Sequence, residues 1–297
     1  RKTMHFNFIH TKTILKIIVS FLAVFYIFLL LTGTIPSLSD PAVSHDTQVS
    51  SIISESSDWN IVFDPEELVY DGSERFDPMI GVTVTDEENI PVETEVFSTI
   101  QSVRGKNQKE ILYTVTTPTG ESISSSRTLK LKDYKGPSIQ LSESLPSISE
   151  DNLNSMATYL SKADALKALD GYDNDISSSV TCEWTHDTEN PLTLHVTFQI
   201  ENRFLDTAVA KADLSLQLKK PYLALSATTI KLARNAPFDP YYYVQIAMDS
   251  DGHLLPDAIT ITGHVDTSTS GTYTLSYTVS DSSGKSSSEK FLNVVVE

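Results

Sequence analysis

An internal repeat is the feature of this sequence that most restricts its fold. The tripeptide Phe-Asp-Pro at residues 76–78 matches the one at 238–240, and Tyr-Thr-Val follows each of them, at 113–115 and 277–279. A glycine lies seven residues after each of these tyrosines. Such self-similarity indicates that one small structural unit is used more than once. A divergent middle copy has Phe198-Gln-Ile at the Tyr-Thr-Val position and lacks both the Phe-Asp-Pro and the turn glycine.

The last copy has the alternation of a half-buried strand. Tyr273, Leu275, Tyr277 and Val279 occupy every second position, with Thr or Ser between them. A turn cluster follows at 280–284, and then a second apolar stretch that ends at 296. This pattern predicts an antiparallel hairpin with one solvated face.

Units of roughly 75–85 residues with short alternating strands and frequent turns are typical of a β-sandwich. We therefore predict an all-β protein of tandem immunoglobulin-like β-sandwich domains, preceded by a single N-terminal transmembrane helix. One segment departs from strand spacing and predicts one or two short helical turns in the second domain. Its apolar residues are Leu153, Met156, Leu160, Ala163 and Leu166, with Ser149 as the candidate N-cap. The predicted domains are 58–135, 136–220, which is the divergent one, and 221–297.

The N-terminal region predicts a membrane segment. Residues 17–34 are uncharged, with Lys12 and Lys16 before them and Asp40 after them. An apolar helix of about 20 residues spans a bilayer, and the positive-inside rule puts the basic residues 1–16 in the cytoplasm. The Ser- and Pro-containing residues 35–57 are predicted to be a stalk. We expect a single-pass protein of the cell membrane with its C-terminal domains extracellular, or a secreted one if cleavage follows Thr32-Gly33-Thr34.

The net charge restricts the classes of partner that this chain can bind, and the cysteine content restricts how its domains are stabilised. Residues 1–39 hold four basic and no acidic residues, so the remaining chain holds 18 basic and 39 acidic residues and carries a formal charge of −21. Such a field repels phosphate backbones, which predicts no nucleic-acid binding. Cys182 is the only cysteine, so no disulfide can form within the chain and the cores must be held by apolar burial.

The repeats resemble the bacterial immunoglobulin-like domains of Gram-positive cell-surface proteins, a type also found in insecticidal crystal proteins. The resemblance lies in the Phe-Asp-Pro, in an acidic turn after the next strand, and in residues 265–273 and 277–284. It covers 221–297 most clearly, then 58–135, and 136–220 least. It implies a β-sandwich and a spacer, adhesion or carbohydrate-proximal role at the cell surface, and it brings no catalytic residues.

Signatures of catalysis are not found in the sequence. There is no G-x-S-x-G, H-E-x-x-H, phosphate-binding glycine loop or cysteine pair. Cys182 could be a nucleophile with His186 or His195 nearby in sequence, but we interpret it as a small apolar core residue. We predict no catalytic residue and no cofactor.

Two sets of residues are candidates for binding. Closely spaced carboxylates suit Ca²⁺, which takes six to eight oxygens, but Asp and Asn are also the ordinary residues of tight turns, and we favour the turn interpretation. Tyr241 and Tyr243 in the run Tyr-Tyr-Tyr could stack on a sugar; on a strand at most two rings share a face, and we favour packing. The calcium candidates are Asp173, Asp175, Asp249 and Asp251.

The sequence therefore predicts a non-enzymatic cell-surface protein that presents tandem immunoglobulin-like domains as spacer, adhesion or scaffold modules. Two alternatives stay open: the N-terminal arm of a larger surface enzyme, and a carbohydrate-binding accessory module. The predicted partners are the membrane, through the N-terminal helix, and an unidentified cell-wall or host glycan or protein ligand.

Overall fold

The computed structural model describes residues 59–101, 105 and 107–297. All of them belong to one compact unit, Ser56–Glu297. The predicted cytoplasmic segment, membrane segment and stalk (1–57) lie outside the described residues. Within the described residues, none of the helices has both the length and the apolar character needed to cross a bilayer.

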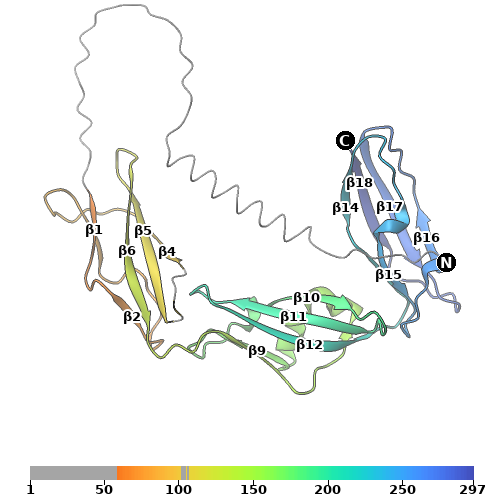
Figure 1. Ribbon diagram of the computed structural model, residues 1–297, viewed down its shortest axis with the longest axis horizontal. Coiled ribbons are helices and arrows are strands. Elements are labelled where there is room, and N and C mark those ends of the chain that lie inside the picture. The colour runs from red at the N-terminus through yellow and green to blue at the C-terminus, as the bar shows by residue number, and fades with distance from the viewer. Residues whose placement is uncertain (1–58, 102–104, 106) are drawn as a thin grey trace, which may run out of the picture. The chain divides into compact units, whose positions relative to one another are not determined.

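The strands of the described residues fall into three consecutive groups of six, which we call the first, second and third strand sets (Figure 1). The prediction of a β-sheet protein is confirmed by this content. The first set comprises β1 (Asn60–Phe63), β2 (Leu68–Tyr70), β3 (Val82–Thr85), β4 (Val96–Gln101), β5 (Gln108–Thr116) and β6 (Ser122–Leu131).

The second set adds three short helical segments to its six strands. It comprises β7 (Ser138–Leu141), β8 (Ile148–Ser149), the 3₁₀ helix η1 (Glu150–Ser155), α2 (Met156–Lys162), β9 (Leu166–Leu169), the 3₁₀ turn η2 (Ser177–Ser179), β10 (Thr181–His186), β11 (Thr193–Glu201) and β12 (Thr207–Gln217).

The third set includes the hairpin that the sequence predicted, and this prediction is confirmed by the antiparallel pairing of its last two strands. It comprises β13 (Tyr222–Leu225), β14 (Thr229–Leu232), the 3₁₀ helix η3 (Pro240–Tyr243), β15 (Val244–Met248), the 3₁₀ turn η4 (Pro256–Ala258), β16 (Ile259–Thr262), β17 (Gly271–Val279) and β18 (Lys290–Val296).

All three sets pair their strands in the same way. The first and third strands of each set form a two-stranded antiparallel sheet. The fourth, fifth and sixth strands are antiparallel neighbours, and the second strand pairs in parallel with the sixth. The divergent middle region therefore keeps the strand pairing of its neighbours, although its sequence has lost their motifs.

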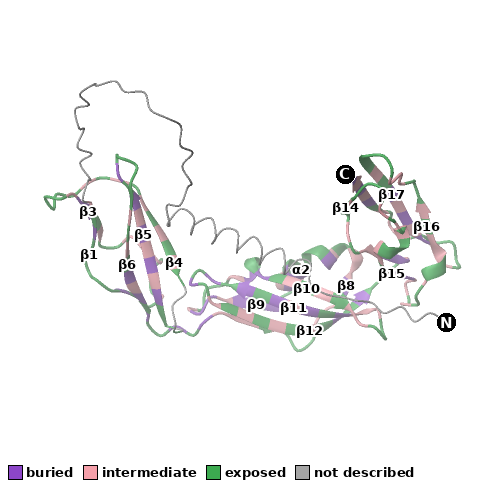
Figure 2. Ribbon diagram, turned by 45° about the horizontal axis from the view of Figure 1, so that its top comes forward, coloured by how far each residue is buried: buried purple, intermediate pink, exposed green. Residues whose placement is uncertain are grey.

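Three apolar clusters of buried residues correspond largely to the three strand sets, and the second cluster also includes Tyr222 and Met248 of the third set. Figure 2 marks buried residues in purple. Along the fifth strand of each set, inward residues are buried and outward residues are more exposed, as alternation along a strand requires. The three cores together account for most of the buried apolar side chains of the described residues. The largest fully buried aromatic side chains of the fifth strands are Tyr113 in the first set, Phe198 in the second and Tyr277 in the third.

The structure explains why Phe-Asp-Pro and Tyr-Thr-Val recur together. The hydroxyl of Tyr113 donates to the carbonyl of Pro78 at 2.6 Å, and the hydroxyl of Tyr277 donates to the carbonyl of Pro240 at 3.0 Å. A buried hydroxyl needs such a partner, so the tyrosine and the loop that supplies the carbonyl belong together. In the middle set Phe198 has no hydroxyl, and no such carbonyl is required.

The predicted helical turns are confirmed by η1 and α2, and they lie where the other two sets carry Phe-Asp-Pro, between the second and third strands. Met156 and Leu160 of α2 are fully buried in the same apolar cluster as Phe198. Ser149 stands at the N-cap position of η1 but makes no side-chain cap hydrogen bond, and Leu166 begins β9 instead of continuing the helix.

Candidate functional site

One five-residue turn positions most of the acidic residues that the sequence singled out. In each copy the first residue donates its backbone N–H to the carbonyl of the fifth, and the fifth donates its N–H to a side-chain oxygen of the first. The fourth residue has a positive φ. Two copies occur in each strand set, at 86–90, 117–121, 170–174, 202–206, 249–253 and 281–285.

Asp173 and Asp175 have separate partners. Asp173 is the fourth residue of its turn, with φ 64°, and its exposed carboxylate lies 2.9 Å from Lys135 Nζ. Asp175 Oδ1 accepts the backbone N–H of Ser177 at 2.8 Å, and hydrogen bonding by Ser177 lowers the pKa of this carboxyl. Each carboxylate is thus engaged with a protein donor, but only Asp175 accepts a nearby backbone N–H as the turn interpretation expects.

Asp249 and Asp251 lie closer together. Asp249 Oδ1 accepts the backbone N–H groups of Asp251 and His253, and its Oδ2 lies 2.9 Å from His253 Nδ1. One ligand atom from each of these three residues lies within 4.8 Å of the others. The hydrogen bond to Asp249 raises the pKa of His253, so the arrangement favours a protonated imidazole. Calcium binding at either acidic turn stays the untested alternative to the turn interpretation that the sequence favoured.

The prediction that Tyr241 and Tyr243 lie on a strand is wrong, because η3 contains both. Asp239 accepts the backbone N–H of Tyr241 at 2.9 Å, and Pro240 at the first helical position has no N–H to satisfy, which together start a helix. Tyr243 is partly buried and stacks on Phe238 with ring centroids 5.9 Å apart. Tyr241 is 54% exposed and Tyr242 79% exposed, so these two rings are the exposed ones of the run, although Tyr242 meets Tyr243 edge-to-face at 5.3 Å.

Cys182 is half-buried on β10, against the second apolar cluster, and burial raises the pKa of its thiol. His195 points to the other face of the sheet, between the carboxylates of Asp187 at 2.9 Å and Asp213 at 2.7 Å. His186 lies on the inner side; its Nδ1 contacts the carbonyl of Pro191 at 2.6 Å, and burial lowers its pKa. The thiol therefore has no imidazole arranged to activate it among these residues, which agrees with the core interpretation.

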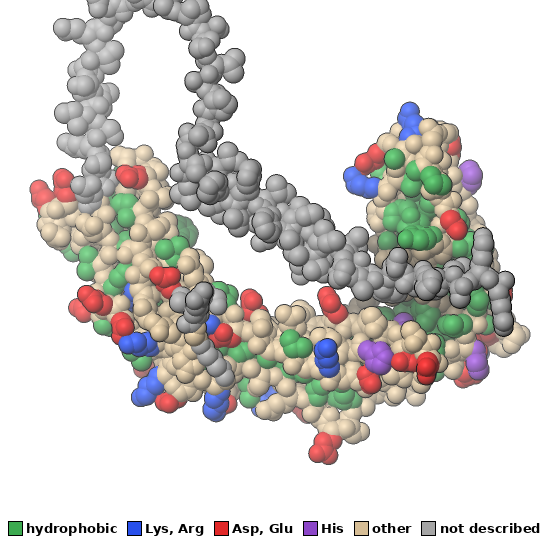
Figure 3. Space-filling model, viewed as in Figure 1, with side chains coloured by type: hydrophobic (Ala, Val, Ile, Leu, Met, Phe, Trp, Pro, Cys, Tyr) green, Lys and Arg blue, Asp and Glu red, His purple; other side chains and the backbone are tan. Residues whose placement is uncertain are grey.

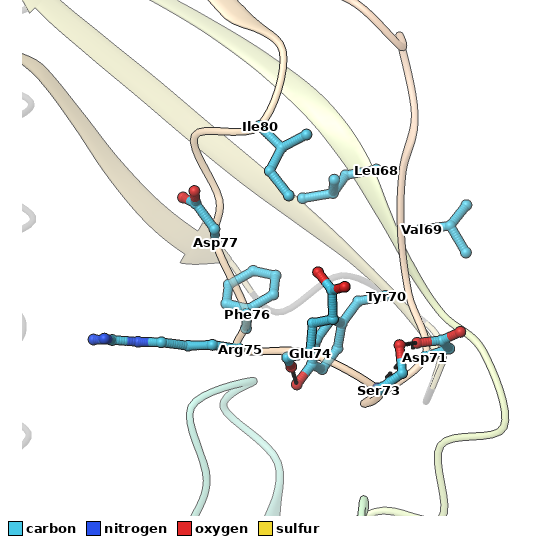
Figure 4. Close-up of a pocket in the computed structure, with 10 residues that line it drawn as sticks. All are labelled: Leu68, Val69, Tyr70, Asp71, Ser73, Glu74, Arg75, Phe76, Asp77 and Ile80. Atoms are coloured by element: carbon cyan, nitrogen blue, oxygen red, sulfur yellow. Dashed lines mark hydrogen bonds between the residues drawn. The ribbon is translucent and has the colours of Figure 1, made fainter.

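The hollow drawn in Figure 4 is small. The segment after β2 folds back on that strand and encloses about 120 Å³ among Leu68, Tyr70, Phe76 and Ile80, with Arg75 pointing outward. Pockets that hold sugars or cofactors are roughly 300–1,000 Å³. A second, open hollow of about 360 Å³ has polar lining and is formed by Lys135, Gly136, Pro137, Leu205, Asp206 and Thr207.

The second hollow adjoins the hairpin turn 202–206, which the sequence did not single out. Phe204 of this turn is fully buried and belongs to the apolar cluster of the first strand set. Asp206 pairs with Lys109, whose side chain is 1% exposed. The available signal was a bulky apolar pair, Phe204-Leu205, at the tip of a hairpin where the related turns have Thr-Gly and Ser-Gly.

Residues 226–290 match the family described as bacterial surface protein, Ig-like domain, which confirms the resemblance drawn from the sequence for this part of the chain. No curated protein matches the sequence.

Several solved structures match with low similarity. A Clostridium perfringens ZmpB structure of the M60 catalytic domain with CBM51-1 and CBM51-2 is 11% identical over 81% of this chain and 31% of that chain, with a TM-score of 0.24. The structure of ZmpB CBM51-2 with GlcNAc and the INT domains is 18% identical over 52% of this chain and 40% of that chain, with a TM-score of 0.21. Human CDH23 EC21-23 is 10% identical over 77% of this chain and 97% of that chain, with a TM-score of 0.19. The chain thus spans about a third of the first, and scores this low carry no argument about function.

Proposed function

We propose that the chain is a non-enzymatic surface protein whose residues 58–135, 136–220 and 221–297 act as three immunoglobulin-like spacer or scaffold domains. The observation that carries this proposal is the threefold use of one strand pairing, the last copy of which matches a bacterial surface Ig-like domain. The acidic turns support it as well, because their carboxylates accept backbone N–H groups of their own turns.

We further propose that residues 17–34 hold these domains at the cell membrane, with residues 1–16 in the cytoplasm. The support is the uncharged run with basic residues on one side only. The strongly acidic remainder suits exposure to solvent, and Figure 3 shows Asp and Glu side chains spread over the visible face instead of gathered in one patch.

Single cysteines labelled on intact cells test the proposed topology. In a Cys182→Ala background, Ser282→Cys places a thiol at an exposed turn of the third strand set, and His5→Cys places one in the basic N-terminal segment. A membrane-impermeant maleimide should label S282C on intact cells that express the full chain, and H5C only after lysis. Labelling of H5C alone contradicts the proposal. Labelled protein in the medium that begins after Thr34 makes residues 17–34 an export signal instead of an anchor.

A carbohydrate-binding role is the second candidate, and the exposure of Tyr241 and Tyr242 favours it. Aromatic rings that present an exposed apolar face can stack on sugar rings. A glycan array with the full chain should then give signals that Tyr242→Ala abolishes and Phe97→Ala keeps, since Phe97 is an exposed aromatic residue of the first strand set. A blank array rejects this second candidate and leaves the spacer proposal intact.

A further inference from the structure

The hairpin turn 202–206 differs from the other two hairpin turns in its surroundings. Its third residue, Phe204, is 0% exposed, whereas the corresponding residues Thr119 and Ser283 are exposed. Phe204 follows β11 of the second strand set, yet it is a member of the apolar cluster of the first. The tip of one strand set is therefore part of the core of another.

Aromatic rings surround Phe204. Three of the four contacts are edge-to-face, the arrangement that aromatic pairs favour because the positive edge of one ring meets the negative face of the other. Burial in this cluster raises the pKa of both Tyr134 and Tyr172. The ring centroids lie 5.4 Å from Phe204 at Phe76, 5.6 Å at Tyr134, 5.8 Å at Tyr70 and 6.1 Å at Tyr172.

A polar network closes over these rings. Lys109 Nζ lies 2.7 Å from Asp206 Oδ1, and the Tyr134 hydroxyl donates to Asp206 Oδ2 at 2.8 Å. Asn202 donates through Nδ2 to the Tyr134 hydroxyl at 2.6 Å and to the carbonyl of Asp170 at 2.7 Å. Because the side chain of Lys109 is buried, its ammonium depends on Asp206 for a partner, and separating them leaves a buried charge unpaired.

A second turn of the same strand set makes a parallel contact. Tyr172, in the turn 170–174, donates its hydroxyl to the carbonyl of Tyr70 at 3.0 Å, and the two rings meet edge-to-face at 5.0 Å. The approach requires a glycine: a Cβ at Gly72 would lie 2.4 Å from Cδ1 of Tyr172, and φ there is 80°. Two turns of the second set thus contact residues of the first, and Gly72 leaves the space that the Tyr172 ring occupies.

We propose that the turn 202–206 is a plug that makes the first and second strand sets unfold as one cooperative unit. Phe204 completes the first core only while β11 and β12 hold the turn in place, so unfolding of either set exposes the same aromatic cluster and the Lys109–Asp206 pair. Shared burial of this kind couples segments that would otherwise open separately. The inference goes beyond the proposed function and does not depend on the location or the partners of the protein.

Pulsed hydrogen exchange with mass spectrometry across a urea series tests the plug on the full chain. Peptides from β5–β6, β11–β12 and β17–β18 report the three strand sets separately. In the unmodified protein the first two should lose protection at the same urea concentration. Phe204→Ala should separate them by about 1 M urea, with β5–β6 the earlier, from the usual loss for a buried phenylalanine and the usual urea dependence.

Two further variants make the result decisive. Phe198→Ala removes an equally buried phenylalanine from the second core and leaves the plug intact, so it should lower the β5–β6 and β11–β12 midpoints together. Phe204→Leu, which disturbs packing less, should give a smaller separation in the same direction and replaces F204A if that variant does not fold. Separate midpoints in the unmodified protein, or coincident midpoints in whichever Phe204 variant folds, overturn the proposal.

Discussion

Two hairpin turns of the same geometry have opposite surroundings in this protein. In the turn 281–285, between β17 and β18, Asp281 accepts the N–H groups of Ser283 and Lys285, and Gly284 takes the positive φ of 86°. In the turn 202–206, between β11 and β12, Asn202 takes the place of the aspartate and Leu205 takes that of the glycine, at φ 61°. The first turn lies in solvent, and the second is the plug.

The comparison distinguishes the residues that form the turn from those that hold the plug against the first strand set. Both turns depend on a side-chain oxygen at the first position, which Asp and Asn supply equally well. Only Asn also has an NH₂ group, and in the plug that group reaches Tyr134 and the carbonyl of Asp170. The glycine is dispensable, because Leu205 adopts the same left-handed conformation at some strain.

Substitution of the first residue of each turn should give the largest difference in stability between the two turns. Asn202→Asp keeps the turn but removes two buried donors and adds a charge beside the Asp206 pair, so we expect a loss of about 3–4 kcal/mol in unfolding free energy. Asp281→Asn in the exposed turn should leave the urea midpoint almost unchanged. Equal effects of the two exchanges would mean that the plug makes no special use of its asparagine.

Removal of the Lys109 ammonium should give the second-largest loss of stability. Lys109→Met leaves Asp206 without its cation, and because that carboxylate is 24% exposed we expect a loss of about 2–3 kcal/mol, below the range for fully buried pairs. Lys231→Met removes an exposed partner of Glu297, for which roughly 0–1 kcal/mol is expected. Urea unfolding of both variants measures the difference, and a loss at Lys109 no larger than at Lys231 contradicts burial of the pair.

Substitutions at the fourth residue of the two turns should change the stability in opposite directions. Nothing lies within 4 Å of a Cβ at Gly284, so Gly284→Leu tests the backbone alone and should destabilise by about 1–2 kcal/mol. Leu205→Gly relieves the same strain but makes the unfolded chain more flexible, for a net gain of about 0–1 kcal/mol. Thermal unfolding compares them; a large loss for L205G would show that the leucine side chain itself contributes to docking.

The smallest difference is in pH dependence. The Ser283 hydroxyl, together with the backbone N–H groups of the turn, lowers the pKa of Asp281 below its ordinary 3.8. A lowered pKa stabilises the fold above the unfolded-state value, and this contribution is lost as pH falls through the folded-state value. Carboxyl NMR titration should therefore give Asp281 a value under 3.8. Asn202 does not titrate, so the plug turn has no equivalent acid-dependent cap.

The sequence was sufficient where local pattern decides structure. Alternation from Tyr273 to Val279 predicted the last hairpin, and the spacing of Leu153, Met156 and Leu160 predicted the short helices. The strand prediction for Tyr241 and Tyr243 failed because it counted aromatic residues and overlooked Asp239-Pro240, a helix-starting pair.

The plug could not be predicted because its contacts join residues far apart in the chain. Lys109 and Asp206 are 97 residues apart, and no local pattern connects them. The calcium candidates illustrate the opposite case: Asp249 was correctly placed in a turn from its neighbours alone, while its contact with His253 follows from the turn geometry.

The hydrogen bonds from Tyr113 and Tyr277 to proline carbonyls bear on how this chain could diverge. Losing the loop alone leaves the tyrosine hydroxyl without this acceptor, and losing Tyr277 alone leaves the carbonyl of Pro240 without its tyrosine donor, so each single change carries a penalty that a paired change avoids. In the first set the penalty for losing the tyrosine is smaller, because Arg127 also donates to the carbonyl of Pro78, at 2.8 Å. The middle copy has changed at both places, with Phe198 at one and a helix at the other, and its strand pairing is intact. The same strand pairing can therefore be kept where the residues that accompany it in the other two copies have been replaced.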